Sequence, residues 1–295
     1  MLGIKEYNQK IDSLRSTKKI TSAMKMIAAT KLRRAQARKE ESVPYNKSLQ
    51  KVLHRLRSIA GENKGLLLEG HPEVKKIHIL VYTSDRGLCG SFNSSAVKKA
   101  LKLAEDAKAE GKEVSFSFIG KKAHDFYKKR DFTIDHYYEE VLKNPSIESI
   151  DPVVKDLLEG FKEGTYHEVY LVFSRFKSAL SQKPQAQMVL PMQGETDRAD
   201  QPKDDDTLEK EVEYIFEPKV EELLLLLLPK LFRFQVFHAL LDSTASEHGA
   251  RMTAMDSATG NCSKLIDRYV LLRNRARQAA ITTELTEIVA GKEAL

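Results

Sequence analysis

The stretch KKITSAMKMIAATKLRRAQ, from Lys18 to Gln36, decides the fold of this chain. Its apolar residues recur at spacings of three and four, which places them along one side of a helix. The residues from Ile4 to about Ile59 are rich in Lys, Arg, Ala, Met and Leu, all good helix formers, so the sequence predicts one long N-terminal helix. We expect Pro44 to bend or interrupt it, because proline lacks the N–H that the helix needs. The apolar stripe of the quoted stretch runs through Ile20, Met24, Ile27, Ala28, Leu32 and Ala35.

A second long helix is predicted from about Pro218 to the end of the chain. Its apolar residues repeat with a period near 3.5, and at 1.5 Å per residue it would extend roughly 100 Å. A helix of that length cannot be enclosed by a globule of this chain's size. The simplest arrangement pairs the two long helices antiparallel. The C-terminal stripe runs through Phe234, Phe237, Leu241, Ala245, Met252, Met255, Cys262, Ile266, Tyr269 and Ala276.

The centre of the chain alternates between β-rich runs and helical patterns. This alternation predicts a small parallel or mixed sheet with helices on both faces. Residues 191–211 are acidic and contain Pro and Gly, which is typical of a loop or linker. We therefore predict three parts: a helix over residues 1–60, an α/β domain over 70–212 and a second helix over 213–295. The expected strands are 77–82, 114–119, 132–138, 169–173 and 187–190.

Composition excludes several classes of protein. The most apolar run, Leu223 to Leu228, is six residues long, whereas a membrane-spanning helix needs about 20, so we interpret it as buried helix. Cys89 and Cys262 show neither disulfide nor zinc-site spacing. His238 and His248 lie ten residues apart, unlike a metal-binding pair on one helical turn. We therefore expect neither a metal nor a cofactor.

Positive charge is concentrated at the N-terminal end. Residues 1–60 hold fifteen Lys and Arg against four Asp and Glu, although the whole chain carries only +6. A run of this kind is usually a solvated helix face, but it also suits an acidic partner. A coiled-coil protein that binds nucleic acid is one alternative, and the acidic centre of the chain argues against it.

A glycine-containing loop follows the first expected strand, in the segment TSDRGLCGSFN from Thr83 to Asn93. A loop between strand and helix can cradle phosphate, yet neither the P-loop pattern nor GxGxxG is present. A nucleotide-binding enzyme built on the α/β domain remains the alternative function. Asp85 and Cys89 could form a catalytic pair, but no base lies close in sequence to both. We favour a glycine turn that approaches another surface.

Four segments together resemble the gamma subunits of F-type ATP synthases: KKITSAMKMIAATKLRRAQ, TSDRGLCGSFN, ASEHGARMTAMDSATGNCSKLID and RARQAAITTELTEIV, in the family's order. The resemblance implies a non-catalytic rotor shaft, with a Rossmann-like domain inserted into an antiparallel coiled coil. The implied partners are the alpha and beta subunits of a hexamer, the epsilon subunit and the membrane c-ring, with no nucleic acid and no direct membrane insertion. Because the centre lacks the chloroplast members' cysteines, a bacterial type is expected, at the cytoplasmic face of the inner membrane.

The resemblance also carries functional positions over to this chain. It implies that the N-terminal shaft and the upper shaft touch the surrounding ring, and that the glycine loop approaches the edge of the catalytic subunit. The shaft positions are Lys18, Lys19, Met24, Lys25, Arg277, Gln278, Thr282 and Glu284, and the loop positions are Asp85, Arg86, Gly87, Leu88 and Cys89.

Overall fold

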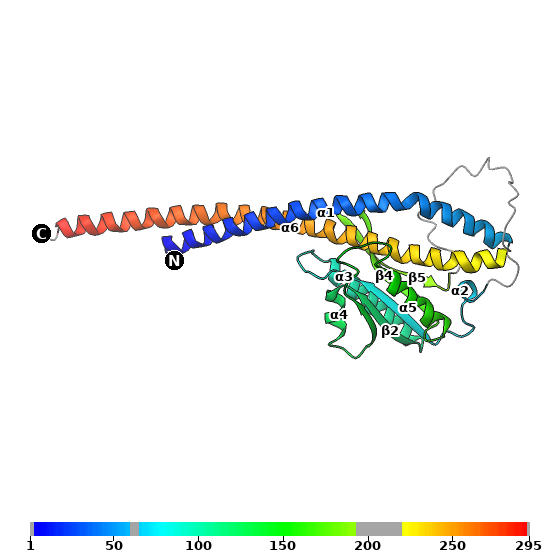
Figure 1. Ribbon diagram of the computed structural model, residues 1–295. Helices are drawn as coiled ribbons and strands as arrows, with labels where there is room; N and C mark the ends of the chain where they lie inside the picture. The colour runs from blue at the N-terminus through cyan, green and yellow to red at the C-terminus, as the bar shows by residue number, and fades with distance from the viewer. Residues whose placement is uncertain (1–2, 60–64, 193–219, 294–295) are drawn as a thin grey trace. The chain divides into compact units, whose positions relative to one another are not determined.

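The computed structural model describes residues 3–59, 65–192 and 220–293. Contacts divide the chain into two compact units, Met1–Thr30 with Arg251–Leu295, and Lys31–Ala250. The first and last helices each contribute residues to both units. The elements are α1 (Ile4–Ile59), α2 (Leu66–Glu69), β1 (Lys76–Tyr82), α3 (Phe92–Ala109), β2 (Glu113–Ile119), α4 (Lys121–Tyr127), β3 (Thr133–Tyr138), α5 (Asp151–Lys162), β4 (Glu168–Ser178), β5 (Ser181–Leu190) and α6 (Val220–Glu293) (Figure 1).

The unit of residues 31–250 is built on one five-stranded sheet with the order β3-β2-β1-β4-β5. β1 pairs in parallel with both β2 and β4, β2 pairs in parallel with β3, and β5 runs antiparallel to β4. The mixed sheet that the sequence predicts is therefore confirmed. β4 and β5 are longer than expected, because they continue as a hairpin from Phe173 to Gln187.

Each face of the sheet carries its own hydrophobic core. On one face, apolar residues of β1 and β2 pack with buried alanines of α3 and with Tyr127 of α4. On the other, residues of β1 and β4 pack with α5 and with the first part of α6. Because both faces of β1 are covered, its sequence is a nearly continuous apolar run.

Polar contacts add to the apolar attachment of α6 to this sheet. The hydroxyl of Tyr82 donates to the carbonyl of Val236 at 3.0 Å, and the hydroxyl of Ser246 donates to the carbonyl of Ser174 at 2.8 Å. Both bonds are buried. Because a buried hydroxyl without a partner is costly, they fix where α6 crosses the sheet.

In the unit of residues 1–30 and 251–295, α1 and α6 run antiparallel. Tyr7 contacts Tyr269 with ring centroids 6.2 Å apart, and the hydroxyls of Thr21 and Thr259 lie 2.8 Å apart. As the residue number rises along α1, that of its partner on α6 falls. The structure thus confirms the predicted antiparallel pairing of the two ends of the chain (Figure 1).

The predicted N-terminal stripe is wrong in part. Ala28, Leu32 and Ala35 are buried, but Ile20 and Ile27 are 60% and 58% exposed. Thr21 takes the buried position instead, because its hydroxyl is paired with that of Thr259. A polar side chain can face a helix interface when its hydrogen bond is satisfied there.

Pro44 does not interrupt its helix. α1 continues through Pro44, as α6 continues through Pro229. α6 begins at Val220, and the expected start at Pro218 lies outside the described residues, as does most of the expected linker, residues 193–211. Gly65 has a left-handed φ of 79° and precedes the short helix α2.

The leucine run at the start of α6 is only half buried. Leu224 and Leu228 lie in the core, whereas Leu225 and Leu226 are 63% and 59% exposed. By length and composition alone, one stretch within Glu222–Ala290 is apolar enough to cross a membrane, and 44% of it is buried. A core helix meets the same criterion, so this composition by itself identifies no membrane span.

Gly160 should be the helix glycine least tolerant of substitution. A Cβ there would lie 2.5 Å from the Tyr166 ring, and Tyr166 is held by hydrogen bonds to the carbonyls of Asp156 and Leu157. We expect Gly160→Ala to destabilise α5 by about 1–3 kcal/mol through overpacking, measured by hydrogen exchange of α5 amides.

The matched control is Gly260→Ala in α6, where nothing lies within 4 Å of the added Cβ. Alanine has the better helix propensity, so the free energy of local opening around residue 260 should rise by about 0.5–1 kcal/mol. Amide exchange there should slow accordingly. Equal effects at both glycines would show that the contact with Tyr166 does not limit residue 160.

Candidate functional site

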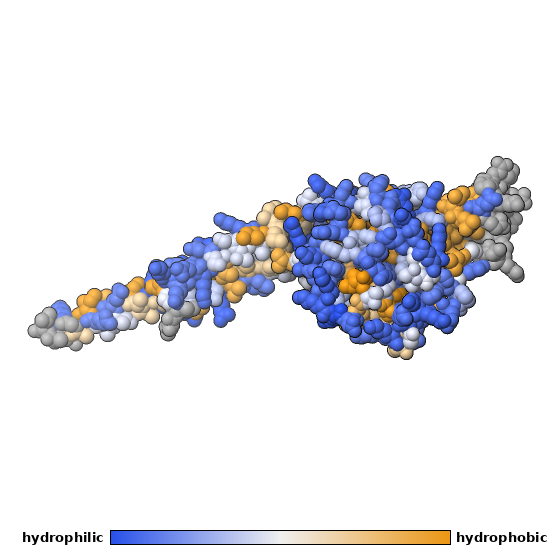
Figure 2. All heavy atoms as spheres, turned by 60° about the horizontal axis from the view of Figure 1, so that its bottom comes forward, coloured by the Kyte–Doolittle hydropathy of each residue, from blue (hydrophilic) through white to orange (hydrophobic). Residues whose placement is uncertain are grey.

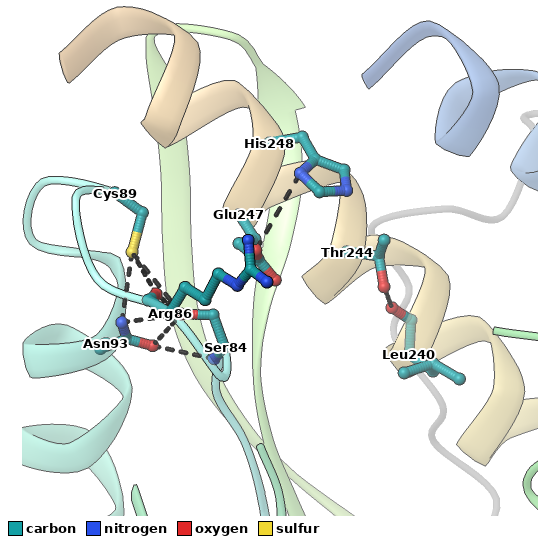
Figure 3. A network of polar contacts seen from close by, with 8 residues as sticks. All are labelled: Ser84, Arg86, Cys89, Asn93, Leu240, Thr244, Glu247 and His248. Carbon is teal, nitrogen blue, oxygen red and sulfur yellow. Dashed lines mark hydrogen bonds and ion pairs between the residues drawn. The ribbon is translucent and has the colours of Figure 1, made fainter. Parts of the chain in front are cut away.

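The loop between β1 and α3 is closed by a small set of polar contacts. The N–H of Ser84 donates to Asn93 Oδ1 at 2.9 Å, and the Ser84 hydroxyl donates to the carbonyl of Arg86 at 2.6 Å. Asn93 Nδ2 in turn donates to Cys89 Sγ at 3.2 Å. Figure 3 shows these residues converging. Asn93, the first-turn residue of α3, therefore ties both ends of the loop together.

The same loop is anchored to the start of α4. Asp85 Oδ1 accepts a hydrogen bond from the N–H of Lys121 at 3.0 Å, and Thr83 Oγ1 accepts one from the N–H of Ala123 at 3.0 Å. Gly120 has a φ of 102°, and a Cβ there would lie 2.0 Å from the Thr83 carbonyl oxygen. Only glycine allows this approach. The carboxyl ends of β1 and β2 thus hold the loop in one shape.

Leu88 is the most unusual residue of the loop. Its φ is 63°, in the left-handed region, and its side chain is 63% exposed. A left-handed leucine costs roughly 1–2 kcal/mol, and such strain persists only where the surroundings impose it. The contacts of Asn93 and Asp85 supply that constraint. The result is an apolar side chain presented to the outside.

Asp85 and Cys89 serve the loop's own structure. The carboxylate of Asp85 is bonded to a backbone N–H, and Cys89 is 1% exposed. Figure 3 shows the side chain of Arg86 extending toward Glu247 of α6. The thiol and the carboxylate are therefore engaged in structure, which supports the interpretation of a glycine turn over that of a catalytic pair.

The N-terminal shaft positions lie on an exposed, partly apolar surface of α1. Lys18 and Lys19 are exposed, and Met24 is half-buried. Lys25 Nζ lies 2.6 Å from Asp256 Oδ1 of α6. Sequence reasoning missed Met26, which is 64% exposed beside Ile27. The apolar residues between Met24 and Ile27 cover more than one side of the helix, and this was the signal that could have identified Met26.

The upper shaft positions lie where α6 continues without a helix beside it. Within the smaller unit, α1 starts at Ile4, near the level of Arg273, whose Nη1 contacts Asn8 Oδ1 at 3.3 Å. Arg277, Gln278, Thr282 and Glu284 lie beyond this level and are exposed. Exposed apolar side chains accompany them and appear as orange at the surface in Figure 2; they are Ile281, Leu285, Ile288 and Val289.

A buried polar cluster in the sheet was also missed by sequence reasoning. His78 Nδ1 lies 2.7 Å from Ser115 Oγ and 3.2 Å from Asp135 Oδ2, and its ring stacks on Tyr166. Burial lowers the pKa of His78, against the opposing effect of Asp135. Burial alone would raise the pKa of Asp135, but hydrogen bonds from His78 and Ser115 hold it below its usual value. The three residues lie on three different strands, so no spacing in the sequence could have revealed the cluster.

Comparison with solved structures shows where the same fold occurs. A chain of the Euglena gracilis mitochondrial ATP synthase rotor matches 94% of this chain and 98% of its own length, with a TM-score of 0.60 and 16% identity. At that identity the likeness concerns the fold. Two paired terminal helices with an inserted α/β sheet are thus a fold that also occurs in a chain of a mitochondrial ATP synthase rotor.

Sequence comparisons identify the family. The family profile described as ATP synthase matches residues 3–295. ATP synthase gamma chains of Geobacter metallireducens and Magnetococcus marinus are 43% and 41% identical, over 100% of this chain and 99% of theirs. The chain therefore belongs to the ATP synthase gamma chain family. It is a non-catalytic, central-stalk subunit of a membrane-associated F-type ATP synthase, and a nucleotide-binding enzyme on the α/β domain is not favoured.

Removing the Asn93 side chain should open the loop. We expect Asn93→Ala to raise the alkylation rate of Cys89 by about tenfold or more, because the lost hydrogen bonds are worth about 1–3 kcal/mol. Peptide mass spectrometry of the labelled native protein measures this rate. Ser94→Ala, which removes an exposed hydroxyl bonded to the Ser91 carbonyl, is the control, and a similar rise there would exclude a specific role for Asn93.

The buried histidine should make the stability of the sheet depend on pH. A lowered folded pKa means that unfolding takes up a proton, so stability falls as pH drops below the ordinary value of 6.5. Asp135 contributes only below about its own ordinary value of 3.8. Urea unfolding between pH 7 and pH 5 should show a slope that His78→Gln reduces. An unchanged slope in His78→Gln would remove His78 as its cause.

Proposed function

We propose that this chain couples proton flow through a membrane c-ring to ATP synthesis by turning inside a hexamer of alternating alpha and beta subunits. Its partners are then alpha, beta, epsilon and the c-ring, and it contacts the membrane only through them. The similarity to bacterial gamma chains and the lack of any cysteine between Cys89 and Cys262 support a place at the cytoplasmic face of the bacterial inner membrane.

The C-terminal end of α6 carries this proposal. Residues 281–290 are all exposed, and four of them are large and apolar. Apolar helix surface of this kind is costly in water unless another protein covers it. The alpha and beta subunits around Arg277, Gln278, Thr282 and Glu284 supply that cover. Because most side chains of this end are small or apolar, no single contact holds the helix at one angle.

The basic surface of α1 fits a moving contact with acidic loops. Lys18 and Lys19 are exposed, as are Lys31, Arg33 and Arg34 further along the helix. Each exposed ion pair is worth only about 0–1 kcal/mol, so attraction passes from one lysine or arginine to the next without a deep minimum. A shaft that turns requires weak contacts of this kind, and Met24 and Lys25 lie within the same surface.

The loop from Asp85 to Cys89 is the second contact with the hexamer in this proposal. Its shape is imposed from within, and it presents Leu88 outward. We place it against the lower edge of the catalytic subunit. The helices over 1–60 and 213–295 then form the shaft, and the α/β domain over 70–212 forms the foot on epsilon and the c-ring.

Cross-linking in the assembled complex tests the proposal. A cleavable photo-reactive reagent is attached to a Leu88→Cys variant, and the reaction is allowed to link the loop to its neighbour. We expect a product that contains the catalytic subunit, with ATP synthesis and hydrolysis lost in proportion to its yield. Cleaving the linker should restore both activities, because the shaft is then free to turn.

Lys99→Cys, on the exposed face of α3, carries the same reagent as a control and should give no link to the catalytic subunit. Full coupled activity in a complex whose Leu88 link is complete would contradict a turning shaft. A product without the catalytic subunit would contradict the placement of the loop.

A further inference from the structure

A buried ion pair joins α1 to α6 within the unit of residues 31–250. Lys39 Nζ lies 2.6 Å from Asp242 Oδ1, and the Asp242 side chain is 3% exposed. The other carboxylate oxygen lies 3.7 Å from His238 Nδ1. Apolar residues close to the pair in the sequence are also buried: Ala35 on α1 and Leu240, Leu241 and Ala245 on α6.

Such a pair contributes to position more than to stability. Desolvation of the buried Asp242 carboxylate and the half-buried Lys39 ammonium offsets much of their attraction, so an apolar pair of similar volume would be about equally stable. A buried carboxylate left without its cation is, by contrast, strongly destabilising. Within the unit of residues 31–250, a charged pair in a mostly apolar helix interface thereby favours one register.

The sequence around Lys39 makes this selection sharp. Sliding α1 by one turn, about 5.4 Å, would bring Ala35 or Val43 opposite Asp242, and neither can supply a positive charge. The adjacent cation, Arg38, is engaged elsewhere, because its Nη1 donates to the carbonyl of Pro145 at 3.0 Å. Lys39 is thus the residue that allows Asp242 to be buried here.

The contact of Arg38 extends the joint to the α/β domain. Arg38 bonds to Pro145, and Arg233 of α6 bonds to the same segment. Arg233 Nη2 donates to the Ile147 carbonyl at 3.3 Å. Its Nε and Nη2 also donate to the Asp151 carboxylate, at 2.6 and 2.9 Å. Basic side chains of both long helices therefore bond to residues 145–151, and the Lys39–Asp242 pair fixes the position of one helix relative to the other.

We propose that the Lys39–Asp242 pair fixes the register between α1 and α6, and with it the position of α1 relative to the α/β domain, when the subunit turns. We call this pair the register pin. This inference rests on the proposed rotor function for its consequence, although the pin itself is a statement about helix register. Without the pin, α1 and α6 would stay associated through their apolar stripes, and twisting force would be lost by slippage between them.

The decisive variant replaces both charges, Lys39→Met with Asp242→Leu, so that no unpaired carboxylate remains and folding is retained. Spin labels on cysteines introduced at the exposed positions Glu41 and Lys230 report the distance between the two helices in the assembled complex. We expect the distance distribution to broaden or shift by about one helical turn, about 5.4 Å, and ATP synthesis to fall relative to ATP hydrolysis.

Two controls make the outcome specific. Lys39→Arg keeps the charge and should retain the native distance and coupling. Lys76→Met with Glu113→Leu removes an exposed pair of the α/β domain, 2.9 Å apart, and should change neither. A double variant at 39 and 242 with the native distance and full coupling would overturn the pin. A native complex that shows no coupling would instead overturn the proposed function and leave the distances as an independent test.

Discussion

The structure depends on one imbalance: the C-terminal helix carries apolar surface that the described residues, 3–59, 65–192 and 220–293, do not cover. α1 pairs with it antiparallel, but α1 begins at Ile4, so α6 continues past that level with residues 281–290 exposed. Burial of apolar surface drives both folding and association. Other subunits of the ATP synthase can cover the surface that stays exposed.

Polar side chains determine position within this apolar framework. Tyr82 and Ser246 attach α6 to the sheet, Asn93 shapes the loop, and Lys39 neutralises the buried carboxylate of Asp242. Each is buried or half-buried, so an alternative arrangement would leave a donor or acceptor unpaired at a cost of about 1–3 kcal/mol or more. Apolar contacts permit many similar packings, and these few bonds select one. A rotating subunit needs that selection, since a loosely defined shaft would yield under load.

Most of the architecture could be predicted from periodicity and propensity. The five strands appear in the expected order, and both long helices form. The predictions that were wrong concern which side of a helix is buried. Ile20 and Ile27 are exposed while Thr21 is buried, because a hydrogen bond to Thr259 from the far end of the chain decides the matter. The cluster of His78, Ser115 and Asp135 was missed for the same reason, since strand pairing brings these residues together. The expected contact residues of the shaft and loop stay a prediction.

The sequence by itself determined the kinds of element and their order, because helix and strand periods are local properties of neighbouring residues. It also determined that the ends of the chain would pair, since each long helix carries an apolar stripe. Only the tertiary structure decided the register of that pairing, the left-handed presentation of Leu88 and the burial of Asp242. The register and the burial of Asp242 depend on contacts between residues more than two hundred positions apart, and the shape of the loop around Leu88 depends partly on one that spans 36 positions. No local pattern records which distant partner a side chain will meet.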